Sequence, residues 1–291
     1  MNAPVQKIEE LEKTANTIRT HLVKMIAKSG TGHAGGSSSI TEIVTVLYFH
    51  EMNVKKGNPD YPERDRFVLS KGHACPAQYA AFAELDYIPK DMLWTLHHIN
   101  SPLQMHPELG FCPGIEMSTG ALGQGLSAGI GMALGLRKQK KNSRVYVVIG
   151  DGESMEGQIW EAAMSAPKFK LDNLCAVLDY NKFSLSDRVQ NVMPLEPLRD
   201  KWQAFGWYVL EVNGHSIAQL VNAFDQARQI KGKPVIIIAH TVKGFRITHV
   251  EDQAQSHSVS FTKDQVKSTL QHFGCSQQEI DETIAIMEGV K

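Results

Sequence analysis

Apolar, β-branched runs that alternate with helical patterns constrain the fold of this chain more than any other feature. One run, at residues 144–149, is Arg-Val-Tyr-Val-Val-Ile, and another, at 174–178, is Leu-Cys-Ala-Val-Leu. Continuous apolar runs of this length are typical of strands buried on both faces of a parallel sheet. Similar runs occupy residues 66–69, 207–212 and 235–240. The alternation predicts a three-layer α/β/α fold with a mainly parallel sheet and right-handed crossovers.

The segments around the predicted strands carry helical patterns. The longest helix is expected at residues 8–28, where apolar side chains recur at helical spacing. Other helices are expected at residues 39–50, 76–85, 90–98, 124–139, 157–167, 195–205 and 216–228. The helix at 124–139 is rich in glycine, which makes it a candidate for a tightly packed subunit contact. A capping box, Ser276 to Glu279, precedes a last apolar stripe.

The composition argues against several classes of function. The 291 residues carry a formal net charge of -1, which provides no basic surface for nucleic acid. No apolar run reaches the roughly 20 residues needed to span a bilayer, and the N-terminus lacks the apolar core of a signal peptide. The four cysteines have no close metal or redox spacing. We therefore expect a cytoplasmic protein that binds neither nucleic acid nor membrane, with residues 1–291 forming one domain with helical N- and C-terminal extensions.

Polar residues directly follow two of the predicted strands. Asp151 stands between Gly150 and Gly152 after the first run, and Asn181 follows the second. If the two strands are neighbours, both residues lie at the carboxyl edge of the sheet, where α/β folds bind ligands. Carboxylate and amide oxygens suit Mg²⁺ or Ca²⁺, and the glycines let backbone N–H groups approach a phosphate. A strand-end Asp and a turn Asn are the simpler alternative, but their placement one βα unit apart favours a Mg²⁺-diphosphate clamp.

Several histidines fall on predicted loops that can meet at the same sheet edge. They are His33, His73, His106 and His257. Taken singly, each is more simply a solvated or hydrogen-bonded side chain. Their spacing does not match a zinc site, so as a group they are interpreted as proton-transfer and hydrogen-bonding residues. Two lysines beside glycine, Lys71 and Lys243, are either phosphate contacts or ordinary surface residues.

Together these segments resemble the N-terminal, thiamine diphosphate-binding half of transketolase, over roughly residues 10–262. The matching segments are Gly30-Thr-Gly-His-Ala-Gly-Gly36, Asp65-Arg-Phe-Val-Leu-Ser-Lys-Gly-His73, His106-Pro-Glu108, Ser118-Thr-Gly-Ala-Leu-Gly-Gln-Gly-Leu126, Gly150-Asp-Gly152, Asp179-Tyr-Asn181, Val250-Glu-Asp252 and His257. The Gly-Asp-Gly to Asn spacing marks the wider thiamine diphosphate class. The combination of Ser-Lys-Gly-His, Thr-Gly-x-Leu-Gly-Gln-Gly and Val-Glu-Asp with a later His is specific to transketolase-like members.

The resemblance implies a cofactor site. Asp151, the Asn181 side chain and the Phe183 carbonyl would hold Mg²⁺, for which Ca²⁺ or Mn²⁺ can substitute, together with diphosphate oxygens and water. The implied contacts to thiamine diphosphate are Gly36, His73, Gly120, Ala121, Leu122, Gly152, Asn181, Lys243 and His257. The four loop histidines would surround the reacting oxygens of the sugar. Glu156 matches a family Glu at the subunit interface that helps to tune the cofactor.

Three positions depart from the family pattern. Ala34 stands where Pro is usual, Leu185 where a polar residue is frequent, and Lys182 where many thiamine enzymes have a second Asn. None of the three is an implied ligand, so the departures bear on substrate preference and leave the cofactor site intact.

The resemblance also implies a partner. In the family the cofactor lies between two halves, and a Glu of the pyrimidine-binding half, which this sequence lacks, protonates the aminopyrimidine. We therefore expect the N-terminal subunit of a split transketolase, in a heterotetramer with a subunit that carries the pyrimidine and C-terminal domains. The complex would transfer a two-carbon ketol unit from a ketose to an aldose, usually as sugar phosphates.

Two other functions stay open at this point. The α subunit of a 2-oxo acid dehydrogenase shares the Gly-Asp-Gly to Asn clamp, although the His106-Pro-Glu108 segment and the Val-Glu-Asp loop argue against it. A non-catalytic phosphate-binding α/β protein is the other alternative. Because no Gly-x-Gly-x-x-Gly follows the first strand, a dinucleotide site has little support.

Overall fold

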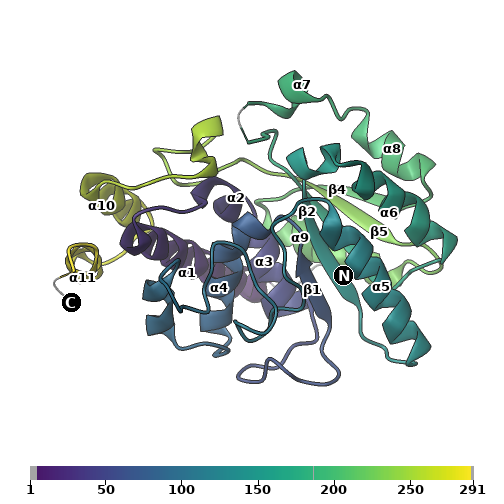
Figure 1. Ribbon diagram of the computed structural model, residues 1–291, viewed down its shortest axis with the longest axis horizontal. Coiled ribbons are helices and arrows are strands. Elements are labelled where there is room, and N and C mark those ends of the chain that lie inside the picture. The colour runs from purple at the N-terminus through teal and green to yellow at the C-terminus, as the bar shows by residue number, and fades with distance from the viewer. Residues whose placement is uncertain (1–4, 186, 290–291) are drawn as a thin grey trace.

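Five parallel strands form the centre of the fold in the computed structural model, which describes residues 5–185 and 187–289 (Figure 1). The strands are β1 (Arg66–Leu69), β2 (Val145–Gly150), β3 (Leu174–Tyr180), β4 (Tyr208–Asn213) and β5 (Val235–His240). They lie in the order β1-β2-β3-β5-β4, and each neighbouring pair is parallel. Strands β2 and β3 are neighbours, with Gly150 opposite Asp179. The residues that follow these two strands therefore meet at one edge of the sheet.

Helices cover both faces of this sheet, so the predicted three-layer α/β/α fold is confirmed (Figure 1). One face carries α1 (Val5–Ser29), α3 (Thr41–Val46), α4 (Cys75–Glu84) and α9 (Ile217–Gln229), and the other carries α5 (Gln124–Lys138), α6 (Gly157–Lys168) and α8 (Leu198–Ala204). Successive side chains of a strand point to opposite faces. Tyr146 and Val148 accordingly join the first core, and Val145 and Val147 join the second.

Several helices differ from their predicted extents. The helix predicted at residues 39–50 consists of α3 and a π-helical turn (Leu47–Glu51), and a separate short helix, α2 (Ala34–Ser39), precedes it. The helix predicted at 90–98 is only a short 3₁₀ helix, Lys90–Thr95, and α8 begins after Pro197. Helix α2 lies very close to a later segment of the chain, since a Cβ at Gly35 would lie 2.4 Å from Ser256 Oγ. Short turns complete the connections at Gly72–Ala74, Gly152–Met155, Val189–Val192 (α7) and Ala254–His257.

The glycines of α5 have two different environments. A Cβ at Gly125 would lie 2.5 Å from Ser70 Cβ, and one at Gly129 would lie 2.5 Å from Val147 Cγ2. These two glycines are therefore explained by close packing of α5 on the sheet. Gly131 and Gly135 have no atom within 4 Å of such a Cβ, so the packing of this chain does not require them.

The C-terminal segment folds back onto α1. Helices α10 (Lys263–His272) and α11 (Gln277–Met287) both begin with capping boxes, and the one at Ser276 is the box predicted from the sequence. Lys28 Nζ donates to the carbonyl oxygen of Ile286 over 2.8 Å, which joins α1 to the end of α11. Within the described ranges, none of the helices combines the length and apolar character that a membrane crossing requires.

Candidate active site

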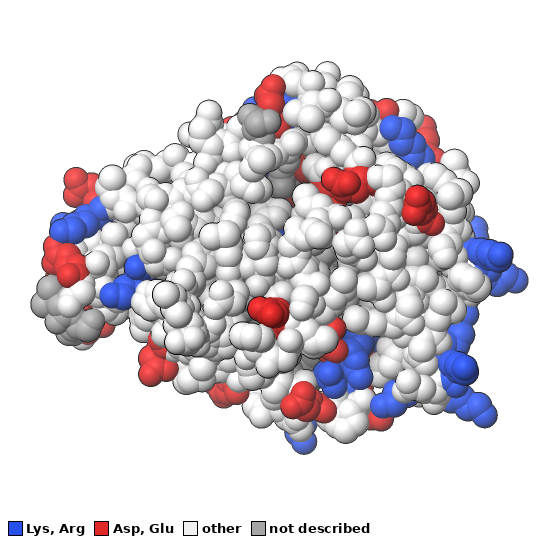
Figure 2. All heavy atoms as spheres, viewed as in Figure 1, with Lys and Arg blue, Asp and Glu red and all other residues white. Residues whose placement is uncertain are grey.

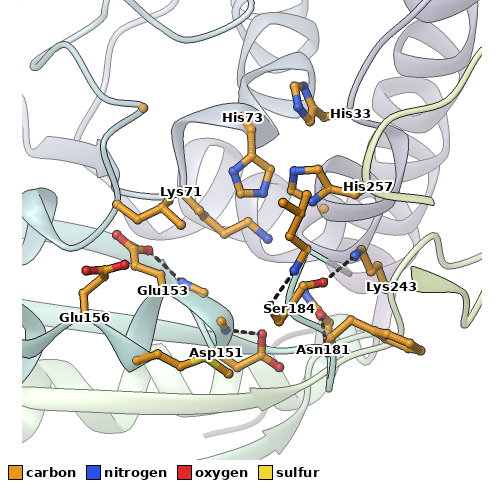
Figure 3. A pocket seen from close by; sticks show the side chains of 18 of the residues that line it. His33, Lys71, His73, Asp151, Glu153, Glu156, Asn181, Ser184, Lys243 and His257 are labelled. Carbon is orange, nitrogen blue, oxygen red and sulfur yellow. Dashed lines mark hydrogen bonds between the residues drawn. The ribbon is translucent and has the colours of Figure 1, made fainter. Parts of the chain in front are cut away.

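A cavity of about 360 Å³ lies at the carboxyl edge of the sheet. Its walls come from the turns after β1, β2, β3 and β5, the start of α2 and the loop before α5 (Figure 3). The predicted site residues are distributed over the same segments, and with one exception they line this cavity. The exception is Ala121, whose side chain is exposed and is not among the lining residues.

The three residues of the predicted metal clamp, Asp151, Asn181 and Phe183, all line this cavity. Asp151 Oδ2 accepts a hydrogen bond from the backbone N–H of Lys182 over 2.5 Å, which ties the turn after β3 to the residue that follows β2. Asn181 Oδ1 accepts from the N–H of Phe183 over 3.0 Å. A Cβ at Gly152 would lie only 3.6 Å from the carbonyl oxygen of Phe183. Backbone contacts thus hold the three residues close to one another at the cavity, and their carboxylate, amide and carbonyl oxygens are the donor types that suit an oxygen-coordinated cation.

The electrostatics of Asp151 also suit a cation. Burial raises the pKa of Asp151 to about 7, and the nearby carboxylate of Asp179 contributes to the same shift. A divalent ion in this position would remove the cost of ionising Asp151. Among the described residues no cluster of three or more His, Cys, Asp or Glu side chains forms a candidate metal site. A cation here must therefore be held by the mixed oxygen set together with oxygens from a bound molecule.

Asp179 is fully buried beneath these oxygens and joins four segments at the floor of the cavity. Its carboxylate accepts hydrogen bonds from Ser39 Oγ (2.7 Å), Thr241 Oγ1 and Asn181 Nδ2 (2.7 Å), and it pairs with the Lys71 ammonium. Burial opposes ionisation, but Lys71 and the hydroxyl donors keep the pKa of Asp179 below its ordinary value. Because Asp179 engages the amide N–H₂ of Asn181, the amide oxygen is the atom left for a cation.

Glu153 is a second buried carboxylate, and the sequence indicated no role for it. It accepts hydrogen bonds from Ser70 Oγ, from the N–H of Gly123 (2.8 Å) and from the N–H of Gly150 (2.9 Å). These contacts connect the end of β1, the start of α5 and the end of β2. Its position directly after Gly-Asp-Gly was the only signal in the sequence, and nothing local indicates which backbone groups it meets.

Lys71 and Lys243 are both buried at the cavity, but their environments differ. Lys71 is neutralised by Asp179. Lys243 Nζ instead donates to the carbonyl oxygen of Ser184 over 3.1 Å and forms no ion pair within the described ranges. Burial, with a contribution from the charge of Lys71, lowers the pKa of Lys243 to about 8. An anionic group in the cavity would therefore stabilise the charged form of Lys243 more than that of Lys71, which already has a counter-ion.

The four predicted histidines come together at the cavity, and Figure 3 labels three of them, His33, His73 and His257. The ring centroid of His33 is 5.4 Å from that of His73, 6.0 Å from that of His106 and 5.1 Å from that of His257. Burial, followed by the nearby positive charges, lowers the pKa of His33 and of His257 to about 4. These rings therefore carry unprotonated nitrogens near neutral pH, which can accept protons or hydrogen bonds from a polar ligand.

The remaining predicted residues border the cavity. Gly36 faces His73, because a Cβ there would lie 3.1 Å from His73 Nε2. Gly120 has a φ of +154° and packs against His106, where a Cβ would lie 3.0 Å from Cγ. Glu156 is exposed at the N-terminal end of α6 and lines the cavity mouth. Among the departures, Leu185 also lines the cavity and is 65% exposed.

This fold, with an oxygen clamp and a buried lysine at the carboxyl edge of the sheet, defines a diphosphate-binding α/β domain. Comparison with known families gives the particular assignment. Residues 11–288 match the family model described as "Transketolase, thiamine diphosphate binding domain". The chain therefore belongs to the transketolase family, as the sequence predicted, and thiamine diphosphate is the cofactor that this family of domains binds.

Relatives that are themselves named as transketolase subunits match this chain over nearly its whole length. The 6-deoxy-6-sulfo-D-fructose transketolase subunit SqwG of Clostridium sp. (strain MSTE9) is 45% identical over 261 residues, which cover 90% of this chain and 95% of that protein. An apulose-4-phosphate transketolase subunit of Phocaeicola vulgatus is 39% identical over 282 residues, covering 97% and 98%. The predicted assignment as an N-terminal subunit of a split transketolase, a thiamine diphosphate-dependent ketol transferase, is thus confirmed.

Solved transketolase structures share the fold. The transketolase from Campylobacter jejuni superposes with a TM-score of 0.87 at 28% identity and covers 97% of this chain. This chain spans only 46% of that structure, so it corresponds to about half of the solved transketolase chains.

Proposed function

We propose that this chain binds Mg²⁺-thiamine diphosphate at the cavity and, with a partner subunit, transfers a two-carbon ketol unit from a ketose to an aldose. The observation that carries the proposal is the convergence of Asp151, Asn181 and Phe183 beside four histidines in one cavity. The family match supports thiamine diphosphate. The metal ion is proposed on the strength of the oxygen donor set and the raised pKa of the buried Asp151.

The residues present fit the cofactor. Asp151, the Asn181 amide oxygen and the Phe183 carbonyl would hold the metal ion, Gly152 would leave space for the diphosphate, and Lys243 would pair with it. When bound, thiamine diphosphate supplies the electron sink for carbanion chemistry. The protein's own contribution is to orient the diphosphate and to provide hydrogen-bonding groups around the substrate.

The histidines are proposed to handle protons of the sugar. The Nδ1 of His33 is buried and has no hydrogen-bond partner among the described residues. Because the rings of His33 and His257 favour their neutral form, an unprotonated nitrogen is available to accept a proton from a substrate hydroxyl. His73 and His106, which also line the cavity, would hold further oxygens of the sugar. A ring that has accepted a proton can return it when the sugar leaves.

A partner subunit is proposed because several large apolar side chains are exposed on the surface of this chain. Leu109, Phe111 and Met193 are 57%, 57% and 56% exposed. In the view of Figure 2, charged side chains lie mostly around the periphery of the face, and its centre is largely uncharged. The relatives named above are described as subunits, which also supports a partner. We propose that the chain forms one cofactor-binding domain and that two copies assemble with two copies of a pyrimidine-domain subunit in the cytoplasm.

The substrates are proposed to be ketoses and aldoses with an anionic terminal group. The names of the two relatives given above refer to 6-deoxy-6-sulfo-D-fructose and to apulose-4-phosphate. In this chain Lys71 is paired with Asp179 and Lys243 lies at the clamp, so neither is free to bind a distal anionic group. The cation that recognises such a group would come from the partner.

The test is a calorimetric titration of the full chain with thiamine diphosphate, with Mg²⁺ and with a chelator. Binding that needs Mg²⁺ is expected. Equal binding without the metal would contradict the clamp, and no binding under either condition would favour the non-catalytic alternative. Addition of the partner subunit should then yield ketol transfer between sugars. Decarboxylation of a 2-oxo acid instead would favour the dehydrogenase alternative, which the family match does not support.

A further inference from the structure

A buried histidine outside the cavity contacts the loop that carries Lys243. His215 lies between β4 and α9, and its side chain is only 8% exposed. Its Nε2 accepts a hydrogen bond from the backbone N–H of Val242 over 2.8 Å. Its ring also stacks on Phe245, with centroids 3.6 Å apart and planes 15° from parallel. One imidazole therefore contacts the loop on both sides of Lys243.

Because Nε2 of His215 accepts a hydrogen bond, the position of the proton on the neutral ring can be assigned. A backbone N–H can only donate, so Nε2 of His215 carries no proton, and the proton of a neutral ring lies on Nδ1. Nδ1 is 3.0 Å from Glu42 Oε2, where that proton has a carboxylate acceptor. An oriented imidazole between a carboxylate and a second group is the arrangement that proteins use to fix a histidine tautomer.

Glu42 is itself anchored to the helical layer. It is buried on α3 and pairs with Arg19, a fully buried residue of α1. Arg19 Nε donates to Ser38 Oγ over 3.2 Å, and that hydroxyl donates to the carbonyl oxygen of Phe245 over 2.6 Å. The loop is thus connected to α1, α2 and α3 through two routes, one by way of Val242 and one by way of Phe245.

We infer that His215 is a positioning residue for Lys243, which it places at the diphosphate end of the cavity by holding the N–H of Val242 and the ring of Phe245. The inference rests on the proposed function, because it concerns the same cofactor site. Ordering a flexible loop when a ligand binds costs conformational entropy. If the main chain on both sides of Lys243 is already fixed, less of this entropy has to be lost when the cofactor binds. The contact to Ser184 then fixes the remaining side chain.

Two substitutions distinguish the effect of the hydrogen bond to Val242 from the effect of ring stacking on Phe245. His215→Phe retains an aromatic ring on Phe245 but leaves the N–H of Val242 without an acceptor. His215→Gln restores an acceptor near the position of Nε2. The matched control is His240→Phe, because His240 also pairs with a carboxylate, Glu211 (2.9 Å), but is more exposed, at the end of β5.

The readouts are the dissociation constant of thiamine diphosphate at saturating Mg²⁺ and the amide hydrogen exchange of Val242 without cofactor, both on the full chain. His215→Phe is expected to raise the dissociation constant about 10-fold, because a loop that is no longer held must be ordered when the cofactor binds, and to accelerate exchange at Val242. His215→Gln should recover most of both effects, and His240→Phe should change neither.

A double-mutant cycle distinguishes positioning from a general loss of packing. If His215 acts through Lys243, His215→Phe should have less than about a 2-fold effect on cofactor affinity in a Lys243→Met background. The same fold-change in both backgrounds, or wild-type affinity in His215→Phe, would overturn the inference while leaving the proposed function intact. If His215→Phe does not fold, Phe245→Leu provides the second variant, and unchanged affinity there would count against the inference. Failure of the wild-type chain to bind the cofactor would instead refute the proposed function, and the inference with it.

Discussion

The Lys71 ammonium and the Asp179 carboxylate form an ion pair that is buried beneath the cavity, with only 2% and 0% of the two side chains exposed. The pair connects the turn after β1 to the end of β3, two strands that are not neighbours in the sheet. Because Asp179 also binds the amide of Asn181, the same carboxylate serves stability and the orientation of a proposed metal ligand.

Asp179→Asn is expected to destabilise the chain by about 3–5 kcal/mol, because it leaves a buried ammonium without a counter-ion. The double variant with Lys71→Met should recover much of this loss, since no buried charge then remains unpaired. Urea unfolding of the wild type, both single variants and the double variant measures the coupling. Strictly additive effects of the two substitutions would show that the pair has no mutual stabilisation.

Asp151→Ala is expected to weaken Mg²⁺-dependent binding of thiamine diphosphate by at least about 100-fold, because it removes the only charged ligand of the proposed clamp. Glu161→Gln, a substitution of an exposed carboxylate on α6, is the control for net charge. Calorimetric titrations at several Mg²⁺ concentrations check the result. An affinity that is unaffected by Asp151→Ala would place the metal elsewhere.

The cavity histidines predict a loss of stability at mildly acidic pH in the chain without cofactor. The pKa of His33 falls from 6.5 to about 4 in the folded chain, chiefly through burial. Between these values the unfolded chain binds more protons, so the free energy of unfolding decreases as the pH falls through this window.

His33→Gln should therefore lose less stability than the wild type when the pH is lowered from 7 to 5. Urea unfolding at both pH values gives the difference, and His272→Gln, at an exposed position of α10, is the control. If His33→Gln and the wild type lose the same stability, His33 is not held neutral by its surroundings.

Substitution by Ala is expected to have opposite effects on stability at two glycines of α5, Gly131 and Gly125. Gly131→Ala should stabilise the chain by about 0.5–1 kcal/mol, since its Cβ meets no atom within 4 Å and Ala favours the helix. Gly125→Ala should destabilise it despite the same helix preference, because its Cβ would lie 2.8 Å from Ser70 Cα and overpacking costs about 1–3 kcal/mol.

Thermal unfolding of both variants checks the signs. The predicted subunit contact at α5 adds a second measurement, because Gly131→Ala should then weaken assembly with the partner even though it stabilises the chain. Sedimentation of the mixed subunits at equal concentration would show this, and unchanged assembly would place the contact on another element.

The residues of the clamp could be located in advance because they depend on local pattern and strand geometry. Apolar runs mark β2 and β3, and once these are neighbouring parallel strands, Asp151 and Asn181 must lie at one edge. The histidines were predicted to meet for a similar reason, since each lies on a loop that the pattern of elements can bring to the same edge of the sheet. For these residues, the order and spacing of the predicted strands and helices are enough to predict that they lie at one edge of the sheet.

The partners of the buried charges could not be predicted in this way. Lys71, Glu153 and His215 each lie in an ordinary turn. Nothing nearby in the sequence indicates that Lys71 meets Asp179, that Glu153 accepts from the start of α5, or that His215 meets Glu42. The close approach of Gly35 in α2 to Ser256 likewise has no signal in the local sequence.

Local sequence thus determined the strands, most of the helices and the edge at which the ligands gather, because these follow from the spacing of apolar residues along the chain. Tertiary structure alone decided which buried charges form pairs and which meet only neutral groups. Burial and Coulomb energy depend on which side chains converge, and that convergence exists only after the crossovers bring distant segments together.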